Sequence, residues 1–234
     1  MISHKLKFIF IHIPKTGGSS LEKFLCNSVA NKVTVEGDST HVYCEFQDCQ
    51  IKHDYIDYYH DMYGEKIKDY YKFAIVRNPY DLIMSLYFFY NHDGFDRNKF
   101  ISYVEEDRNS FISQERVLQC QLQCNQTGKY SDYNHFRQYK YVTYKNRIDC
   151  NIIRYENFIE ELKQIECLKS YDFNNYPKIN CGSFTREYNS HPILPDRPQY
   201  ACYYDEQLYE LVYDKFKEDF ETFNYKKVQP KVAL

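Results

Sequence analysis

Three short apolar runs along the chain predict the strands of a buried sheet. The runs are Phe8 to Ile11, which Ile13 extends, then Phe73 to Val76, and the shorter pair Ile152-Ile153. Uninterrupted apolar runs are typical of parallel strands that are covered on both faces. We therefore expect the three segments to lie side by side in one mainly parallel sheet.

A helical pattern of apolar residues follows each predicted strand. The three patterns begin near Ser20, after Asn78-Pro79 and near Phe158. A fourth pattern, with an acidic outer face, predicts one helix of several turns from Leu208 to Phe220. Strands that alternate with helices predict a three-layer α/β domain with a central, mainly parallel sheet flanked by helices. In such domains ligands bind beyond the carboxyl ends of the strands.

Composition and charge narrow the range of functions. A length of 234 residues suits a single domain over residues 1–234. With 43% hydrophobic and 27% charged residues, the chain is neither disordered nor membrane-embedded. The formal net charge of −3 provides no global positive field, so we expect no nucleic-acid partner and only a local site for a polyanion.

Cysteines and apolar segments indicate the compartment. The nine cysteines form no CxxC pair, so they predict reduced or buried thiols, not a disulfide framework or a zinc ribbon. The first residues of the sequence are basic, as in a signal peptide, but the apolar run after them is short and ends at Ile13. No small-residue cleavage site follows that run. No stretch approaches the roughly 18 apolar residues of a spanning helix. We expect no membrane anchor and a cytoplasmic location.

The segment between the first strand and its helix predicts an anion site. It reads Pro14-Lys15-Thr16-Gly17-Gly18-Ser19-Ser20. Backbone N–H groups at a helix start can hold a tetrahedral anion, and glycines let the backbone approach it. Lys15 can neutralise charge, and Thr16, Ser19 and Ser20 add hydroxyl donors. A nucleoside-triphosphate loop has the order GxxxxGK[ST], whereas here the lysine precedes the glycines, which argues against an ATPase.

A second strand–turn–helix segment predicts another anion site. Arg77 ends the second predicted strand, and Ser85 follows eight residues later on the next helix. A guanidinium can hold a phosphate through a bidentate contact, and a serine hydroxyl can add a donor. The alternative is that Arg77 is a surface cation and Ser85 only fills space in the helix.

Together these two segments resemble the cofactor-binding motifs of sulfotransferases that use 3′-phosphoadenosine 5′-phosphosulfate (PAPS). The stretch from Arg154 to Phe158 and the tail from Tyr203 to Tyr225 are similar to the carbohydrate-modifying branch of that family. The resemblance implies a P-loop-like fold and sulfuryl transfer from PAPS to a hydroxyl of a carbohydrate, by in-line displacement and without a metal. It implies that Lys15 and the loop through Ser20 bind the 5′-phosphosulfate, and that Arg77 and Ser85 bind the 3′-phosphate. Animal members sit in the Golgi behind an anchor, so the Golgi lumen is the expected compartment if this chain is part of a longer protein.

The reaction also requires a general base, which the resemblance places between the two anion motifs. We select His53, because His53-x-x-Ile56 before a predicted helix from Asp54 to Tyr63 resembles the position of a histidine in bacterial relatives. His41 and His60 are the alternative histidines. The carboxylates Glu36 and Glu45 are candidates of another kind.

Three further features leave alternatives open. His53, Asp57 and His60 have the spacing of one helical face, so a metal site is conceivable, although a solvated acidic face explains them as well and we expect no metal. Residues 129–154 contain six Lys and Arg against two Asp, which suits an acidic glycan or a solvated basic surface equally. Arg186, Arg197 and Tyr200 lie in the proline-rich region, where relatives place residues that close over the cofactor or the acceptor, and the pattern of the family is only partly kept there.

Two other functions compete with sulfuryl transfer. A nucleotide-dependent, kinase-like phosphotransferase would bind ATP and magnesium, but the sequence shows no Walker lysine. A noncatalytic module would bind the nucleotide or a sulfated glycan without chemistry. The sequence does not identify the acceptor or the oligomeric state.

Overall fold

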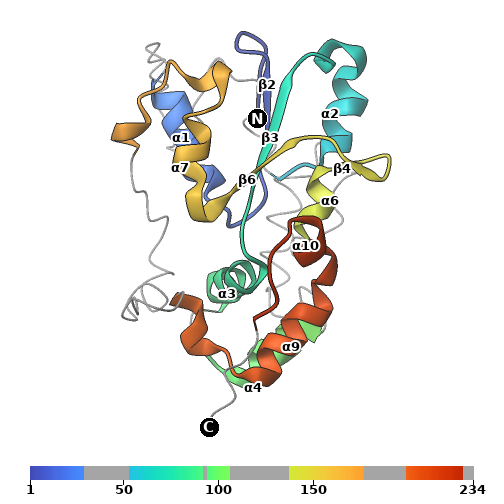
Figure 1. Ribbon diagram of the computed structural model, residues 1–234, viewed down its shortest axis with the longest axis vertical. Coiled ribbons are helices and arrows are strands. Elements are labelled where there is room, and N and C mark those ends of the chain that lie inside the picture. Colours follow the sequence, from blue (N-terminus) through green and yellow to red (C-terminus); the bar gives the residue numbers. More distant parts are fainter. Residues whose placement is uncertain (29–52, 92–93, 106–136, 177–198, 229–234) are drawn as a thin grey trace, which may run out of the picture. The chain divides into compact units, whose positions relative to one another are not determined.

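The computed structural model describes residues 1–28, 53–91, 94–105, 137–176 and 199–228 (Figure 1). The chain divides into two compact units. The first comprises Met1–Val76 and Cys120–Ile179, and the second comprises Arg77–Gln119 and Asn180–Leu234. The first unit contains the sheet, and the described part of the second contains only helical elements. That the whole chain folds as a single domain stays a prediction.

The sheet of the first unit has the strand order β1-β2-β3-β6. Its strands are β1 (Ile2–Ser3), β2 (Phe8–Ile11), β3 (Tyr71–Val76) and β6 (Asn151–Arg154). β2 pairs in parallel with β3, and β3 pairs in parallel with β6, whereas β1 runs antiparallel to β2. The three predicted strands and their mainly parallel pairing are confirmed, and β1 is an additional edge strand.

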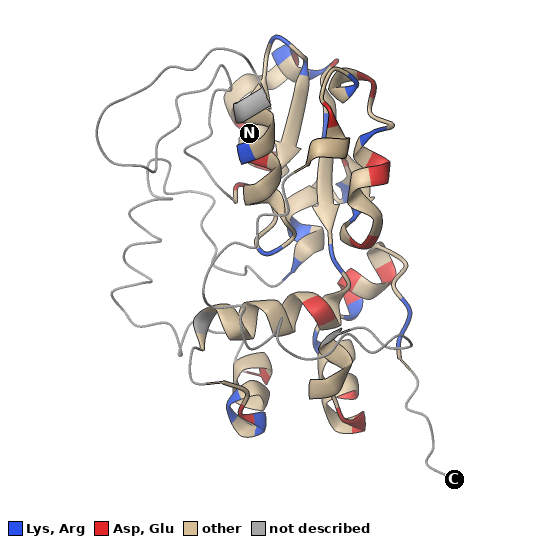
Figure 2. Cartoon of the chain, turned by 90° about the vertical axis from the view of Figure 1, so that its left-hand side faces the viewer, with Lys and Arg blue, Asp and Glu red and all other residues tan. Residues whose placement is uncertain are grey.

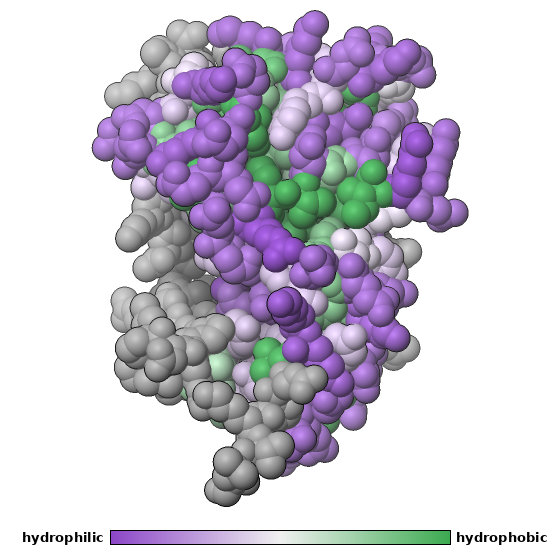
Figure 3. All heavy atoms as spheres, viewed as in Figure 1, coloured by the Kyte–Doolittle hydropathy of each residue, from purple (hydrophilic) through white to green (hydrophobic). Residues whose placement is uncertain are grey.

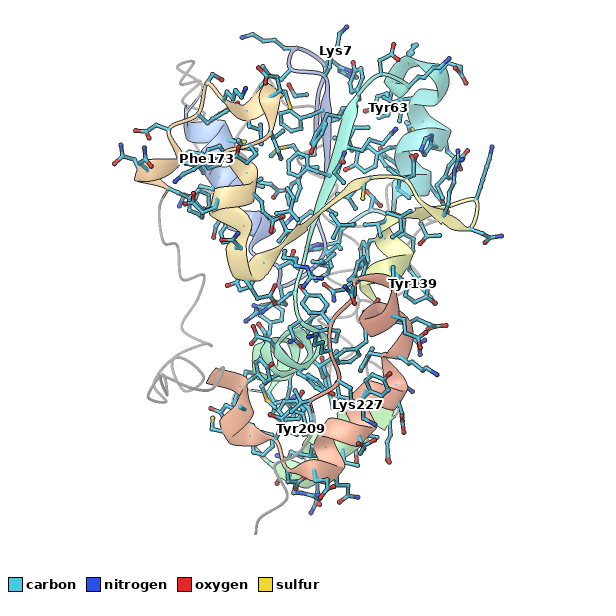
Figure 4. All side chains as sticks on the ribbon, in the orientation of Figure 1. Lys7, Tyr63, Tyr139, Phe173, Tyr209 and Lys227 are labelled. Atoms are coloured by element: carbon cyan, nitrogen blue, oxygen red, sulfur yellow. The ribbon has the colours of Figure 1, made fainter. Side chains whose placement is uncertain are left out.

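Helices cover the strands of the first unit. In Figure 1, α1 (Gly18–Ser28) and α7 (Phe158–Leu162) lie to one side of the strands, and α2 (Ile56–Tyr63) lies to the other. Both faces of β2 are buried, as its continuous apolar run predicts. Phe173, labelled in Figure 4, packs against Phe24 of α1 with the ring centroids 5.0 Å apart. One hydrophobic core thus joins α1, α7 and the sheet.

Short elements complete the first unit. α1 begins two residues before the expected start. α7 is shorter than the pattern through Ile165 suggests, because the amides of Gln164 and Ile165 bond to carbonyls three residues back and the α-helical bonding ends at Leu162. The remaining elements are a 3₁₀ helix at Gly64–Ile67, α6 (Gln138–Val142), the antiparallel pair β4 (Thr143–Tyr144) and β5 (Arg147–Ile148), and 3₁₀ turns at Tyr155–Asn157, Glu166–Leu168 and Phe173–Asn175.

The second unit is built around α3 (Pro79–Tyr90), whose side chains are buried over most of its length. Asn78 caps α3, since its Oδ1 accepts a hydrogen bond from the Tyr80 amide at 3.1 Å, and Pro79 suits the first helical position. Tyr80 packs edge-on against Tyr209, which Figure 4 labels, with the centroids 5.0 Å apart. Burial raises the pKa of the Tyr80 hydroxyl well above its ordinary value. The other elements are α4 (Arg97–Glu105), a 3₁₀ helix at Gln199–Tyr203, α9 (Glu206–Lys215) and α10 (Lys217–Thr222).

The prediction of a single C-terminal helix from Leu208 to Phe220 is wrong in one respect. The structure has two helices, α9 and α10, separated at Phe216, which has φ −115° and ψ 24°. Because Phe216 stays buried, the apolar spacing continues across the break. Hydrophobic periodicity alone therefore does not reveal it.

The surface of the described residues is mainly polar. Figure 2 shows acidic and basic residues dispersed over the elements of both units, and α3 is almost without charge. The face drawn in Figure 3 is mostly hydrophilic, with smaller hydrophobic areas. Within the described chain, Cys150 and Cys167 form no disulfide bond. No helix among the described residues has the length and apolar character needed to cross a bilayer.

Candidate functional site

The turn between β2 and α1 has a tightly wound backbone. Lys15 has φ 62° and Gly17 has φ 85°, both in the left-handed region. The Thr16 hydroxyl donates a hydrogen bond to the carbonyl oxygen of Ile13 at 2.8 Å. Since this bond uses the hydroxyl proton, any role of Thr16 in binding an anion falls to its backbone amide.

Four consecutive amides of this turn are unpaired within the described chain. Ser20 and Leu21 donate their N–H groups to the Gly17 carbonyl at 3.1 and 3.2 Å. The amides of Thr16, Gly17, Gly18 and Ser19 donate to no acceptor among the residues that the structure describes. Such amides at a helix start carry partial positive charge and form a concavity for an anion.

Both glycines of the turn are required by close neighbours. A Cβ atom at Gly18 would lie 2.2 Å from His12 Cδ2 and 2.4 Å from His12 Nε2. A Cβ atom at Gly17 would lie 3.2 Å from Cε2 of Tyr155, and its φ already disfavours other residues. Tyr155 belongs to the Arg154–Phe158 stretch, so that stretch contacts the turn.

Sequence reasoning missed His12, the first residue after β2. Its ring is 2% exposed, and its Nδ1 lies 3.0 Å from Oε1 of Glu22 on α1. The Glu22 side chain is buried as well, and its carboxylate accepts the hydrogen bond from the ring. A contact between a strand end and a helix ten residues later leaves no regular spacing in the sequence. The one available signal was a histidine directly before the loop.

His53 lies beside His12 in the same unit. Its Nδ1 is 3.0 Å from the backbone carbonyl oxygen of His12, and the two ring centroids are 4.4 Å apart in an edge-on arrangement. A carbonyl only accepts hydrogen bonds, so Nδ1 of His53 carries the proton. In the neutral ring the lone pair is then on Nε2. This is the tautomer that a general base requires.

The helical face proposed for His53, Asp57 and His60 is not formed. α2 begins only at Ile56, and His53 precedes it with a φ of 77°, so its side chain does not continue the helical spacing. His60 is held elsewhere, with its Nε2 2.6 Å from Oδ2 of Asp149 and its ring stacked on Tyr144. Among the described residues, no group of three or more His, Cys, Asp and Glu side chains is arranged for a metal.

The second candidate segment follows β3. Arg77 is 8% exposed, and its Nε donates to Oδ2 of Asp81 at 2.6 Å, one helical turn into α3. The Nε contact orients the guanidinium. The amide of Tyr80 already donates to Asn78, which caps α3. At this helix start, the positive charge for an anion therefore comes mainly from the side chain of Arg77.

Ser85 lies inside α3. It is 5% exposed, between Met84 and Leu86, which are buried too. Its hydroxyl forms no hydrogen bond with any part of the chain that the structure describes. Its oxygen is not among the fully buried side-chain atoms without a partner in the described chain, so the hydroxyl is available to donate to a ligand.

Several candidates lie outside the described residues, namely His41, Glu36, Glu45, Lys129, Arg186 and Arg197. The basic residues Lys145 and Arg147 are exposed at the β4–β5 turn, where Lys145 Nζ lies 5.0 Å from the centre of the Tyr144 ring. Tyr200 belongs to the second unit, where its hydroxyl accepts a hydrogen bond from Asn78 Nδ2 at 3.3 Å.

Comparison with known proteins gives one match. The family model described as "Sulfotransferase family" matches residues 1–226, a range that includes every candidate residue above. No curated protein matches the chain, and no solved structure does.

Proposed function

The chain belongs to the sulfotransferase family, and from that premise we propose that it transfers the sulfuryl group of PAPS to a hydroxyl of a carbohydrate. The observation that carries the proposal is the run of four unpaired amides from Thr16 to Ser19 at the start of α1. We include in the proposal a P-loop-like layering of one domain over residues 1–234.

The residues of the first segment fit the phosphosulfate end of the donor. Four unpaired amides and the positive end of α1 belong to one turn, which also contains Lys15, and the Gly18 backbone has no side chain to obstruct an anion. These groups stabilise negative charge that develops on the leaving phosphate when the bond to sulfur breaks. PAPS supplies the sulfuryl group, and the protein supplies the charge and the orientation.

The residues of the second segment fit the 3′-phosphate. Arg77 provides a guanidinium that Asp81 already orients, and Ser85 provides a hydroxyl that has no acceptor in the described chain. Arginine in a fixed orientation is well suited to bidentate recognition of phosphate. An ATP-dependent enzyme has no 3′-phosphate to place there.

His53 is the proposed general base. Its Nδ1–H donates to the His12 carbonyl, so Nε2 accepts the proton of the acceptor hydroxyl. The O–H bond of the acceptor breaks as the N–H bond at Nε2 forms. The exposed cations Lys145 and Arg147 are candidates for holding an acidic carbohydrate acceptor, and the proposal includes neither a metal nor a nucleic-acid partner.

Titration calorimetry with 3′-phosphoadenosine 5′-phosphate, the product nucleotide, tests the cofactor class. We expect the wild-type protein to bind it and not to bind ATP with magnesium. Arg77→Ala is expected to lose most of this affinity, because the guanidinium holds the 3′-phosphate. Arg97→Ala is the matched control, since Arg97 of the same unit also pairs with an aspartate, Asp205, at 2.8 Å. Binding of ATP instead, or equal loss in both variants, would refute the assignment.

Sulfation of a carbohydrate panel with labelled PAPS tests the chemistry. Lys15→Met keeps the aliphatic stem and removes the charge, and we expect it to lower kcat by about 10²- to 10³-fold. His53→Ala is expected to lower kcat by about 10²- to 10⁴-fold. Tight nucleotide binding without sulfation of any acceptor would favour the noncatalytic module.

A further inference from the structure

We propose that His12 and Glu22 form a buried pair that positions His53 as the general base, so that His12 is a positioning residue of the reaction. This inference rests on the proposed function and assigns a role to two residues that touch neither donor nor acceptor in it. Three contacts of the described chain carry it, and all three lie within the first unit.

The first contact anchors the ring of His12. Its Nδ1 lies 3.0 Å from Glu22 Oε1, and both side chains are almost fully buried. A carboxylate that accepts from Nδ1–H fixes both the orientation and the tautomer of an imidazole. Because Glu22 is on α1 and His12 ends at the strand, the pair ties the helix to the end of β2.

The second contact joins His12 to the turn between β2 and α1. The Cδ2–Nε2 edge of the ring packs against Gly18 so closely that no Cβ fits between them. The face of the ring also stacks on Phe10 with the centroids 5.7 Å apart. With one edge on Gly18, one nitrogen on Glu22 and one face on Phe10, the ring has little freedom to move.

The third contact transmits this rigidity to His53. The carbonyl of His12 accepts from His53 Nδ1–H at 3.0 Å, and the two rings meet edge-on at 4.4 Å. His53 itself has a left-handed backbone, φ 77°, which its own segment does not favour. His12 therefore provides both the acceptor that selects the tautomer of His53 and the surface that sets its ring angle.

In the reaction, one proton moves to His53, and the contacts of His12 with Glu22 stay as they are. The acceptor oxygen forms its bond to the sulfur of PAPS as the bond from sulfur to the departing 5′-phosphate oxygen breaks. The proton of the acceptor hydroxyl joins Nε2 of His53, and the imidazolium keeps its Nδ1–H bond to the His12 carbonyl. The Glu22–His12 bond is unchanged in this step. A displacement of a catalytic group by about 1 Å can lower a rate about 10²-fold, so loss of the support predicts a large effect without loss of any reacting group.

Histidine ¹⁵N NMR tests the arrangement without donor or acceptor. We expect His53 of the wild-type protein to be protonated at Nδ1 and unprotonated at Nε2 when neutral, with the resonance assigned by its absence in His53→Ala. Glu22→Met keeps the volume and removes the acceptor of His12, and it should shift His53 towards a mixture of tautomers. Glu22→Gln, which still accepts from Nδ1–H, should restore the wild-type spectrum. An Nε2–H tautomer in the wild-type protein, or no change in Glu22→Met, would overturn the inference.

Kinetics separate positioning from a merely structural role. Glu22→Met should lower kcat by about 10- to 100-fold, Glu22→Gln should recover most of it, and binding of 3′-phosphoadenosine 5′-phosphate should stay unchanged. In a His53→Ala background, Glu22→Met should have no further effect, because it acts through His53. His4→Phe is the control, since it removes another histidine hydrogen bond of this unit, the one between His4 Nδ1 and the Tyr70 hydroxyl at 2.7 Å, and it should leave kcat unchanged. Additive losses, or a parallel loss of nucleotide binding, would contradict the role of His12. If the wild-type protein did not bind 3′-phosphoadenosine 5′-phosphate, the proposed function would be refuted. The NMR experiment would still test the positioning of His53 by His12, because it needs neither donor nor acceptor.

Discussion

The two strand–turn–helix segments of this protein solve the same chemical problem with different groups. After β2, the turn leaves the amides of Thr16 to Ser19 unpaired within the described chain, and a lysine precedes them. After β3, the amide of Tyr80 is consumed by the Asn78 cap, and Arg77 provides the charge. The first segment is therefore suited to bind an anion with its backbone, and the second with a side chain.

This difference explains the residues that each segment contains. A backbone site needs glycine, because any side chain would stand between the amides and the anion or collide with a neighbour, as at Gly18. A side-chain site needs a stable helix start and a fixed guanidinium, which Asn78, Pro79 and Asp81 provide. A backbone site also tolerates little change, whereas a side-chain site can be altered one group at a time.

The largest effect is expected for Gly18→Ala, which would break the backbone site. The new Cβ would lie 2.2 Å from the ring of His12, and that ring is held by Glu22 and cannot move away. We expect loss of binding of 3′-phosphoadenosine 5′-phosphate together with a decrease of about 1–3 kcal/mol in the free energy of unfolding. Calorimetry and urea denaturation measure the two quantities.

Gly64→Ala provides the control for this substitution. Gly64 has φ 51°, but a Cβ there meets nothing within 4 Å. The variant should be destabilised by about 1–2 kcal/mol through backbone strain and should bind the nucleotide normally. Normal binding by Gly18→Ala would show that the turn is not the donor site.

Two substitutions with smaller effects should distinguish the start of α3 from the start of α1. One should change mainly stability, and the other should change mainly nucleotide binding. Asn78→Ala removes the cap of α3 and should lower the free energy of unfolding by about 1 kcal/mol. Ser19→Ala at the exposed start of α1 should change stability by less than about 0.5 kcal/mol. It should weaken nucleotide binding by up to about tenfold, because one donor to the anion is lost. If Ser19→Ala destabilised the protein as much as Asn78→Ala, the first helix start would be structural as well.

The smallest expected effect is the pH dependence of the stability that Asp205 contributes at the start of α9. Asp205 caps α9 through the Leu208 amide at 2.9 Å, and the hydrogen bond from Arg97 lowers the pKa of the Asp205 carboxyl below its ordinary 3.8. A lowered pKa in the folded state stabilises the protein above the unfolded value of 3.8, and this contribution is lost as the pH falls through the folded value. The pair is exposed, so we expect Asp205→Asn to lower stability by only about 0.3–1 kcal/mol at pH 7.

That difference should become smaller as the pH falls from 7 to 3. The neutral cap Asn78 should show no such dependence, so the loss in Asn78→Ala should be the same at both pH values. Urea denaturation at pH 7 and pH 3 measures both differences. If Asp205→Asn lowered the free energy of unfolding as much at pH 3 as at pH 7, the charge of Asp205 would not contribute to the stability of the cap.

The sequence predicted the sheet better than it predicted the site. Strands β2 and β3 were visible because burial on both faces leaves continuous apolar runs. The edge strand β6, in which only Ile153 is buried, was visible from the pair Ile152-Ile153 alone. β1, β4 and β5 have two residues each, too few for any periodicity. The break at Phe216 was hidden because the apolar spacing passes through it.

Within the site, the sequence indicated residue types but not their partners. The glycines and Lys15 stand in a recognisable order, and His53 was selected by its place before a helix. The sequence did not reveal that α2 starts too late to include His53, nor that His12 bonds Glu22 and supports His53. These contacts join residues from separate elements, and only the folded chain brings them together.

Amide NMR during titration with 3′-phosphoadenosine 5′-phosphate tests most directly the central claim that the turn after β2 binds the donor through its backbone. We expect the amide protons of Thr16, Gly17, Gly18 and Ser19 to shift downfield and saturate together, as each gains a hydrogen bond to the phosphate. Lys15→Met should weaken this saturation without abolishing the shifts. Saturating shifts elsewhere, with these four amides unchanged, would contradict the account.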